Sequence, residues 1–129
     1  MNKEVKNTEK LYHQLMSQEE IAFPLPRKRM KASTDRGVYI IFDPHCTVVH
    51  VGRTPRAKNG IRQRLYDHLG GRSSFTQNYL NNDGKKLRGE YTYKYLIVKN
   101  PRSRALLEAY TIGHLSSKHL GLGGNDETK

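Results

Sequence analysis

The strongest constraint on the fold is a pair of β-rich runs separated by a short turn signal. Val38 to Phe42 and Val48 to Val51 are dominated by β-branched and aromatic residues, which favour strands. The residues between them begin with Asp43-Pro44-His45, and Asp and Pro are strong turn formers. Because a short connection allows only antiparallel pairing, the two runs predict a β-hairpin.

The register of this hairpin decides which side chains meet on one face of the sheet. An even-numbered turn centred on Pro44 and His45 would place Tyr39 directly opposite His50. Opposed residues have Cβ atoms roughly 5 Å apart, so the phenol and the imidazole would meet. A one-residue slip would move His50 to the other face. A strand tyrosine also serves in packing, so the pair alone leaves both roles open.

The remaining hydrophobic pattern predicts two helices and a third strand. Ile61, Leu65 and Leu69 form an apolar stripe bounded by glycines, which predicts an amphipathic helix. A polar excursion covers residues 72–90, with a helical turn around 75–80, and a strand is predicted over residues 91–98. Asn100-Pro101 then provides a cap and first position for a helix to about His119.

The first 35 residues predict a helix followed by a basic linker. Thr8 to Met16 offers a capped start and apolar residues at helical spacing, and Pro24 and Pro26 end any helix. The segment from Pro24 to Arg36 is basic and lacks periodicity, so it is either a solvated loop or a phosphate contact. The element order is therefore α-β-β-α-β-α, an α+β class. The predicted units are 1–35 (helix and linker), 36–120 (the main domain) and 121–129 (a glycine-rich tail).

The charge of the chain favours a polyanionic partner. Lys and Arg number 23 against 12 Asp and Glu, a formal net charge of +11, and basic surfaces gain counterion release on meeting phosphates. The single cysteine, Cys46, excludes an intrachain disulfide framework. No apolar run approaches membrane-spanning length, and the first ten residues are too polar for a secretory signal. We expect a nucleic-acid partner, no membrane partner and a cytoplasmic location.

Two further groups carry side chains suited to phosphate chemistry. Arg64 and His68 are four residues apart on the predicted helix, hence neighbours at the edge of its apolar stripe. Arginine can fork onto a phosphate, and histidine can move a proton; a solvated basic face is the alternative. Glu108 emerges among Ala105, Ile112 and Leu115, so its carboxylate needs either an arginine or a divalent cation.

Taken together, these residues resemble the GIY-YIG nuclease pattern. The pattern consists of Gly37-Val38-Tyr39, His50-Val51-Gly52, Arg64 and His68 on the next helix, and Glu108 on a later one. The resemblance covers about residues 36–119 and depends on the order and spacing of four separate elements. It implies a small three-stranded antiparallel sheet flanked by helices. It also implies that Gly37 and Gly52 allow close approach of the backbone.

The resemblance further implies a catalytic set made of Tyr39, His50, Arg64, His68 and Glu108. Tyr39 would act as a general base towards the attacking water, its pKa lowered by a cation or by nearby positive charge. Arg64 would hold the scissile phosphate, and Glu108 would anchor one Mg²⁺ or Mn²⁺ ion. His50 stands where the family motif usually begins with tyrosine.

Contacts with the nucleic acid are expected at Arg53, Arg62, Arg72, Lys85, Lys86 and Asn125. Asn125 is the first candidate for the asparagine that follows the glutamate helix in many family members. Phe75 and Tyr79 are either core residues or stacking groups for bases. The leading hypothesis is a metal-dependent DNA endonuclease, DNA being single- or double-stranded. The alternatives are a non-catalytic nucleic-acid-binding module and an assembly role for residues 1–35, which would form a homodimer.

Overall fold

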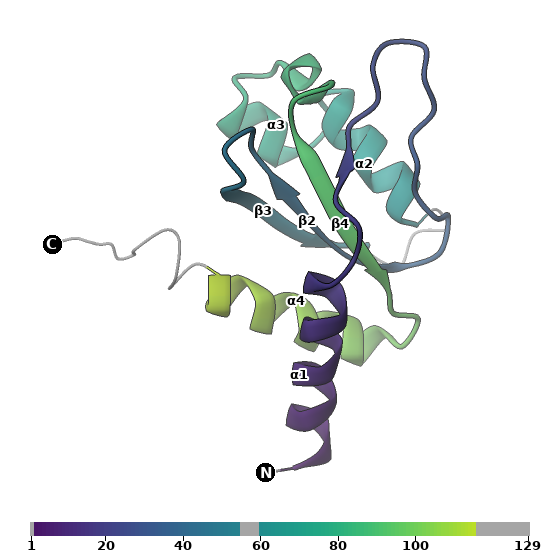
Figure 1. Ribbon diagram of the computed structural model, residues 1–129, viewed down its shortest axis with the longest axis vertical. Helices are drawn as coiled ribbons and strands as arrows, with labels where there is room; N and C mark the ends of the chain where they lie inside the picture. The colour runs from purple at the N-terminus through teal and green to yellow at the C-terminus, as the bar shows by residue number, and fades with distance from the viewer. Residues whose placement is uncertain (1, 55–59, 116–129) are drawn as a thin grey trace, which may run out of the picture.

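An antiparallel sheet of four strands organises the part of the chain that the computed structural model describes, residues 2–54 and 60–115 (Figure 1). Its spatial order is β1-β4-β2-β3. The strands are β1 (Ile21–Ala22), β2 (Gly37–Phe42), β3 (Val48–Arg53) and β4 (Thr92–Ile97). The α+β class is confirmed, but the prediction of three strands is wrong. The additional strand, β1, is a two-residue segment that pairs with β4, too short for any periodicity to reveal.

The hairpin forms, but its register differs from the predicted one. Tyr39 pairs with Gly52, and His50 pairs with Ile41. Two one-residue shifts produce this result. Asp43 N donates to Thr47 O (2.9 Å), which closes an odd-numbered turn, and a bulge lies between the pairs Phe42–Val48 and Ile41–His50. Because the two shifts together equal two residues, His50 stays on the face of Tyr39.

Helices cover both faces of the sheet. One face carries α2 (Ile61–Leu69), α3 (Ser74–Tyr79) and the short 3₁₀ helix η1 (Gly84–Leu87); α1 (Lys3–Met16) and α4 (Pro101–Leu115) cover the other (Figure 1). Every residue of β2 is buried, because this strand has a neighbour on each side and helices above and below. The predicted stripe of Ile61, Leu65 and Leu69 packs into the first layer.

The ends of the outer helices follow their capping residues. The predicted start of α1 at Thr8 is wrong: Asn2 accepts from Val5 N (2.8 Å) and begins the helix, whereas the Thr8 hydroxyl donates to Glu4 O. The predicted start of α4 is confirmed, with Asn100 Oδ1 accepting from Ser103 N at 2.9 Å. The segment from 116 to the predicted end at His119 lies outside the described residues.

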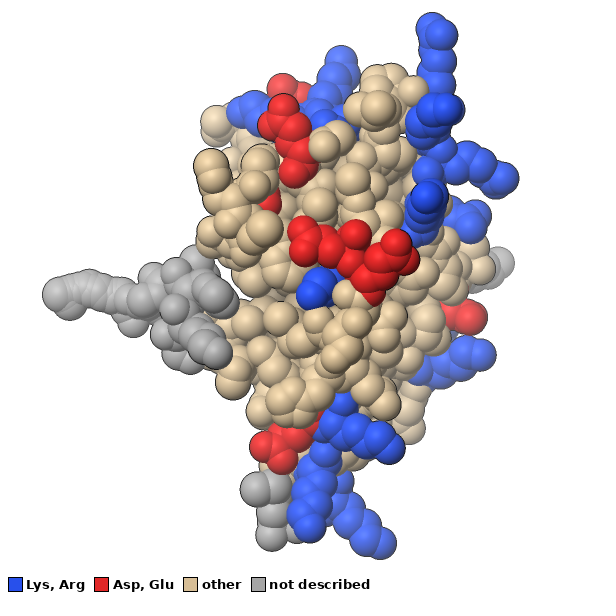
Figure 2. All heavy atoms as spheres, viewed as in Figure 1, with Lys and Arg blue, Asp and Glu red and all other residues tan. Residues whose placement is uncertain are grey.

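The predicted basic linker is an ordered part of the fold. Met30 and Ala32 are buried in the core beneath it, and the Tyr66 hydroxyl accepts a hydrogen bond from Met30 N (3.1 Å). The lysines and arginines of residues 27–31 point outward and gather around this loop at the upper right of Figure 2. The loop is therefore tied down by its apolar residues while its charges face solvent.

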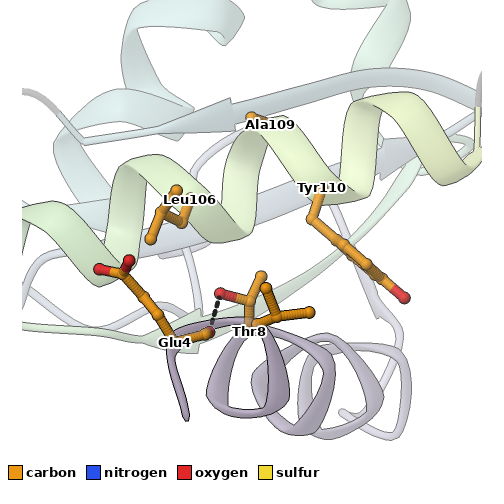
Figure 3. Close-up of a pocket in the computed structure, with 6 residues that line it drawn as sticks. Glu4, Thr8, Leu106, Ala109 and Tyr110 are labelled. Atoms are coloured by element: carbon orange, nitrogen blue, oxygen red, sulfur yellow. Dashed lines mark hydrogen bonds between the residues drawn. The ribbon is translucent and has the colours of Figure 1, made fainter. Parts of the chain in front are cut away.

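A shallow groove of about 350 Å³ separates α1 from α4. Glu4 and Thr8 of α1 face Leu106 and Tyr110 of α4 across it (Figure 3). The helices are held together beside the groove by the ion pair between Glu4 and Arg102 and by the rings of Tyr12 and Tyr110, whose centroids are 5.2 Å apart. None of the helices within residues 2–54 and 60–115 has the length and apolar character needed to cross a bilayer.

Candidate functional site

The candidate site begins where the Tyr39 side chain crosses the edge strand β3. Tyr39 lies on the central strand β2 and pairs with Gly52 of β3. A Cβ atom at Gly52 would overlap the Tyr39 hydroxyl and would lie 3.0 Å from His50 Nε2. Glycine is therefore required at position 52 because the phenol occupies the space of its side chain. The close approach expected at Gly52 thus involves a side chain.

The Tyr39 hydroxyl is the first member of a buried hydrogen-bond chain. Tyr39 Oη lies 2.6 Å from His68 Nε2, and His68 Nδ1 lies 2.6 Å from Ser73 Oγ. Ser73 Oγ in turn donates to Thr76 Oγ1 (3.1 Å), which donates to the backbone oxygen of His68 (2.5 Å). All four side chains are buried. The chain connects the sheet, α2 and the first turn of α3.

The direction of these hydrogen bonds assigns the tautomer of His68. Ser73 gives its own proton to Thr76, so Ser73 Oγ must accept the proton on His68 Nδ1. His68 Nε2 is then unprotonated and accepts from the Tyr39 hydroxyl. Burial, with smaller contributions from His50 and Arg64, lowers the pKa of His68 to about 3, which keeps the ring neutral. His68 was expected at the edge of the core and is instead completely buried.

His50 lies beside this pair with its ring held by aromatic contacts. Its centroid is 5.8 Å from that of Tyr39 and 5.0 Å from that of His68, and it stacks on Phe75 at 4.7 Å. Burial lowers the pKa of His50 to about 4, and the charge of Arg64 contributes. His50 Nε2 is buried and has no hydrogen-bond partner among the described residues. Such a nitrogen is costly to leave unsatisfied, so within the described ranges His50 Nε2 is an unpaired polar atom inside the site.

Arg64 brings a fixed positive charge to the same place. Its Nη1 lies 3.7 Å from Asp67 Oδ2, and its buried Nε has no partner within residues 2–54 and 60–115. The side chain is one-third exposed. Arg64 lowers the pKa values of His50, His68 and Tyr39. The exposed part of the Arg64 side chain can bind an anion that approaches from solvent.

Glu108 reaches the site from α4, on the other side of the sheet. Its Oε1 lies 3.4 Å from Arg53 Nη1, and its side chain is 23% exposed. Burial raises the pKa of Glu108, while Arg53 and Arg64 partly offset this effect. The structure therefore contains the arginine partner that was one of the two predicted solutions. With the Arg53 side chain 43% exposed, that ion pair is of the weak, solvent-screened kind.

The acid–base state of Tyr39 differs from the expected one. Burial raises the pKa of Tyr39, and the charge of Arg64 only partly offsets it, while Glu108 and Asp67 add smaller upward shifts. The protein groups alone therefore keep the phenol protonated. Positive charge from the protein is insufficient to lower this pKa because the ring is completely buried.

The described residues that were expected to contact nucleic acid do not gather in one place. Arg53 lies next to Glu108. Arg62 lies at the start of α2, where its Nε donates to Ala32 O (3.1 Å). Arg72 follows the end of α2 and pairs with Asp67 at 3.2 Å. Lys85 and Lys86 are exposed on η1. Asn125 lies outside the described residues.

Sequence reasoning missed Ser73 and Thr76. Ser73 is the N-cap of α3 and accepts from Thr76 N at 3.1 Å, and a serine before a helical turn is a recognisable cap signal. The cap signal gives no indication that the same hydroxyl binds His68. That contact requires the close packing of α3 on the end of α2, which no local pattern reveals.

A divalent cation could be held only by a sparse set of protein ligands. Among the described residues, no group of three or more His, Cys, Asp or Glu side chains is arranged to hold a metal ion. Glu108 is a single hard oxygen donor, which suits Mg²⁺ or Mn²⁺ with ligands completed by water and substrate phosphate.

In comparisons with known proteins, no family model matches this sequence and no curated protein is significantly similar to it.

Proposed function

We propose that this chain is a metal-dependent endonuclease of the GIY-YIG type that hydrolyses phosphodiester bonds in DNA. The observation that carries the proposal is the convergence of Tyr39, His50, Arg64, His68 and Glu108, from β2, β3, α2 and α4, around the edge strand. Tyr39 and His68 are in hydrogen-bond contact, and the charges of Arg64 and Glu108 both act on Tyr39. The family assignment depends on these motif residues and the α+β architecture.

In this proposal Tyr39, held by its hydrogen bond to His68, positions the attacking water. The hydroxyl proton of Tyr39 is directed to His68 Nε2, so the lone pairs of the phenol oxygen can accept from water. As the water attacks phosphorus and the bond to the leaving oxygen breaks, Tyr39 Oη orients the water, and the water proton passes to a non-bridging oxygen of the phosphate. His68, whose pKa is lowered to about 3, takes no second proton near pH 7. The step needs no free phenolate, in agreement with the raised pKa of Tyr39.

Arg64 and His50 act on the phosphate. The guanidinium of Arg64 offsets the charge that grows on the phosphate oxygens in the transition state. His50 remains neutral near pH 7 because its pKa is lowered to about 4, so it can donate or accept one hydrogen bond from Nε2. In the proposal this nitrogen replaces the hydroxyl that a tyrosine would supply in the second motif.

Glu108 supplies the protein ligand for the cation. A bound Mg²⁺ or Mn²⁺ ion would polarise the scissile phosphate and stabilise the leaving oxygen. Binding would favour the ionised carboxylate of Glu108, against the upward pKa shift caused by burial. Arg53, whose Nη1 lies 3.4 Å from Glu108 Oε1, would contact the DNA backbone beside this carboxylate. A cytoplasmic location and a DNA partner are parts of the same proposal.

Cleavage assays with the full chain test this function. The substrates are supercoiled plasmid, linear duplex and single-stranded oligonucleotides, each with Mg²⁺, Mn²⁺ or EDTA. We expect metal-dependent cleavage that falls about a hundredfold or more in Arg64→Ala and Glu108→Gln. Glu19→Gln, which changes an exposed carboxylate, is the matched control and should cleave normally.

Two results of these assays would contradict the proposal. Equal cleavage by the wild type and Glu108→Gln would remove this residue from the mechanism, and absence of cleavage with every substrate and metal would refute the nuclease proposal. Salt-dependent DNA binding without cleavage would instead identify a non-catalytic nucleic-acid-binding module.

A further inference from the structure

Three aromatic rings form a continuous stack that leads from the candidate site to solvent. His50 stacks on Phe75 with centroids 4.7 Å apart, and Phe75 stacks on Tyr79 at 5.4 Å with an interplanar angle of 12°. His50 belongs to the catalytic set, Phe75 is 7% exposed, and Tyr79 is 50% exposed. The stack therefore starts at a proposed catalytic ring and ends in an open one.

Tyr79 is held in place although it is exposed. One of its faces is covered by the nearly parallel ring of Phe75, so the exposed area falls on the other face and the ring edges. A hydrogen bond with Tyr79 is among the causes that raise the pKa of Tyr91, after burial. Among the exposed large hydrophobic side chains of the described residues, Tyr79 is the aromatic one. Because the ring is already fixed, it loses little conformational freedom when it binds a planar partner.

We propose that Tyr79 stacks on an unpaired base of the DNA strand whose phosphate is bound by Arg64. This inference rests on the proposed nuclease function and specifies its substrate. Every base has a flat face that can stack on an aromatic side chain. The bases of an intact duplex stack on one another and must be unpaired before they can stack on a protein ring.

The position of Tyr79 favours a nucleobase over other planar or apolar partners. Tyr79 is two ring contacts from His50, so a base stacked on it belongs to a nucleotide close to the scissile phosphate. The chain carries a formal net charge of +11, which attracts the phosphates on either side of such a base. The substrate is therefore a single strand or a duplex with a displaced nucleotide beside the cut.

A tryptophan at position 79 provides a direct assay. The natural sequence contains no tryptophan, so Tyr79→Trp introduces a single fluorescent reporter at the end of the stack. The full-length variant is titrated in EDTA with a single-stranded oligonucleotide and with the blunt duplex of the same sequence. We expect quenching by the single strand and little by the duplex. Val5→Trp, an exposed position on α1, is the matched reporter and should respond to neither.

Affinity measurements without metal provide the second test. We expect Tyr79→Ala to weaken single-strand binding about tenfold, which is within the range for loss of one base–aromatic stack. Tyr79→Phe, which keeps the ring, should bind within twofold of the wild type. Duplex binding should be the same in all three proteins. Equal single-strand affinity of wild type and Tyr79→Ala would overturn the proposal.

The two proposals fail in different ways because binding is measured without metal. Quenching of Tyr79→Trp by single strands, in a protein that cleaves no substrate, would support the stacking site and refute the nuclease. Normal cleavage by Tyr79→Ala on single-stranded and displaced-nucleotide substrates, with no quenching of Tyr79→Trp, would retain the nuclease and refute the stacking site.

Discussion

Replacing Gly52 by alanine is the sharpest test of how the candidate site is built. Gly52 lies on the edge strand directly under the Tyr39 phenol, and the new Cβ atom would overlap the hydroxyl and Cζ of Tyr39. The phenol cannot move outward freely because its oxygen is bonded to His68 at 2.6 Å, and both side chains are completely buried.

The expected cost follows from these contacts. Extra volume in a packed core costs about 1–3 kcal/mol, and breaking the Tyr39–His68 hydrogen bond in a buried place costs roughly 1–3 kcal/mol more. Alanine is better than glycine in a strand by about 0.5–1 kcal/mol, which offsets part of the loss. We therefore expect Gly52→Ala to lower the free energy of unfolding by roughly 2–4 kcal/mol. A loss of that size lowers the Tm by about 10 °C.

Urea unfolding followed by circular dichroism measures this change, with an unchanged m-value as the check that the unfolded state is comparable. The matched control is Gly113→Ala in α4, where a Cβ atom would meet nothing within 4 Å. Alanine should stabilise that helical position by about 0.5–1 kcal/mol. If Gly52→Ala unfolds like the wild type and leaves the ring resonances of Tyr39 and His68 unmoved, the phenol does not cross the edge strand at Gly52.

Three other changes probe the acid–base groups. Ser73→Ala removes the acceptor for His68 Nδ1–H, so ¹⁵N NMR should show a changed tautomer ratio of His68; Asn100→Ala, which removes the cap of α4, should leave the ratio unchanged. The pKa of His68 is lowered from 6.5 to about 3, so only the unfolded chain takes up this proton below pH 6.5. The contribution of the neutral His68 side chain to folding stability is therefore complete above pH 6.5 and decreases as the pH falls from 6.5 towards 3. The wild type should accordingly lose roughly 3 kcal/mol more than His68→Gln between pH 7 and 4 in urea unfolding, and parallel curves would contradict this. Arg53→Gln removes a charge that lowers the pKa of Glu108, so the acid limb of the cleavage rate should move to higher pH, and an unmoved limb would show that the ion pair has no effect.

The hairpin illustrates what the sequence could predict and what it could not. The two strands follow from residue type, but the register depended on the turn. That turn is odd-numbered and contains Cys46 in a left-handed conformation, with φ of 64°. A cysteine gives no signal for such a backbone, which glycine or asparagine would have indicated. The predicted meeting of Tyr39 and His50 still occurs, because the added bulge restores the face.

The site shows the same division between local and distant causes. The helix with Arg64 and His68 was predicted from its apolar stripe and its glycine boundaries, which are local signals. The burial of His68, its bond to Ser73 and the reversed pKa shift of Tyr39 depend on which elements pack together. Burial is a property of the assembled layers, so residue spacing alone could not reveal it. The role of Glu108 as a cation ligand stays a prediction.

The place of β2 at the centre of the sheet affects the time at which the candidate site can assemble. Tyr39 pairs with Gly52 on one side and with Tyr95 on the other, and Tyr95 is synthesised long after the hairpin. Non-local strand pairs form slowly because a long loop must close first. During synthesis, the hairpin and α2 can form while β4 and the helix bearing Glu108 are still absent. Assembly of the candidate site is therefore postponed until nearly the whole domain has left the ribosome.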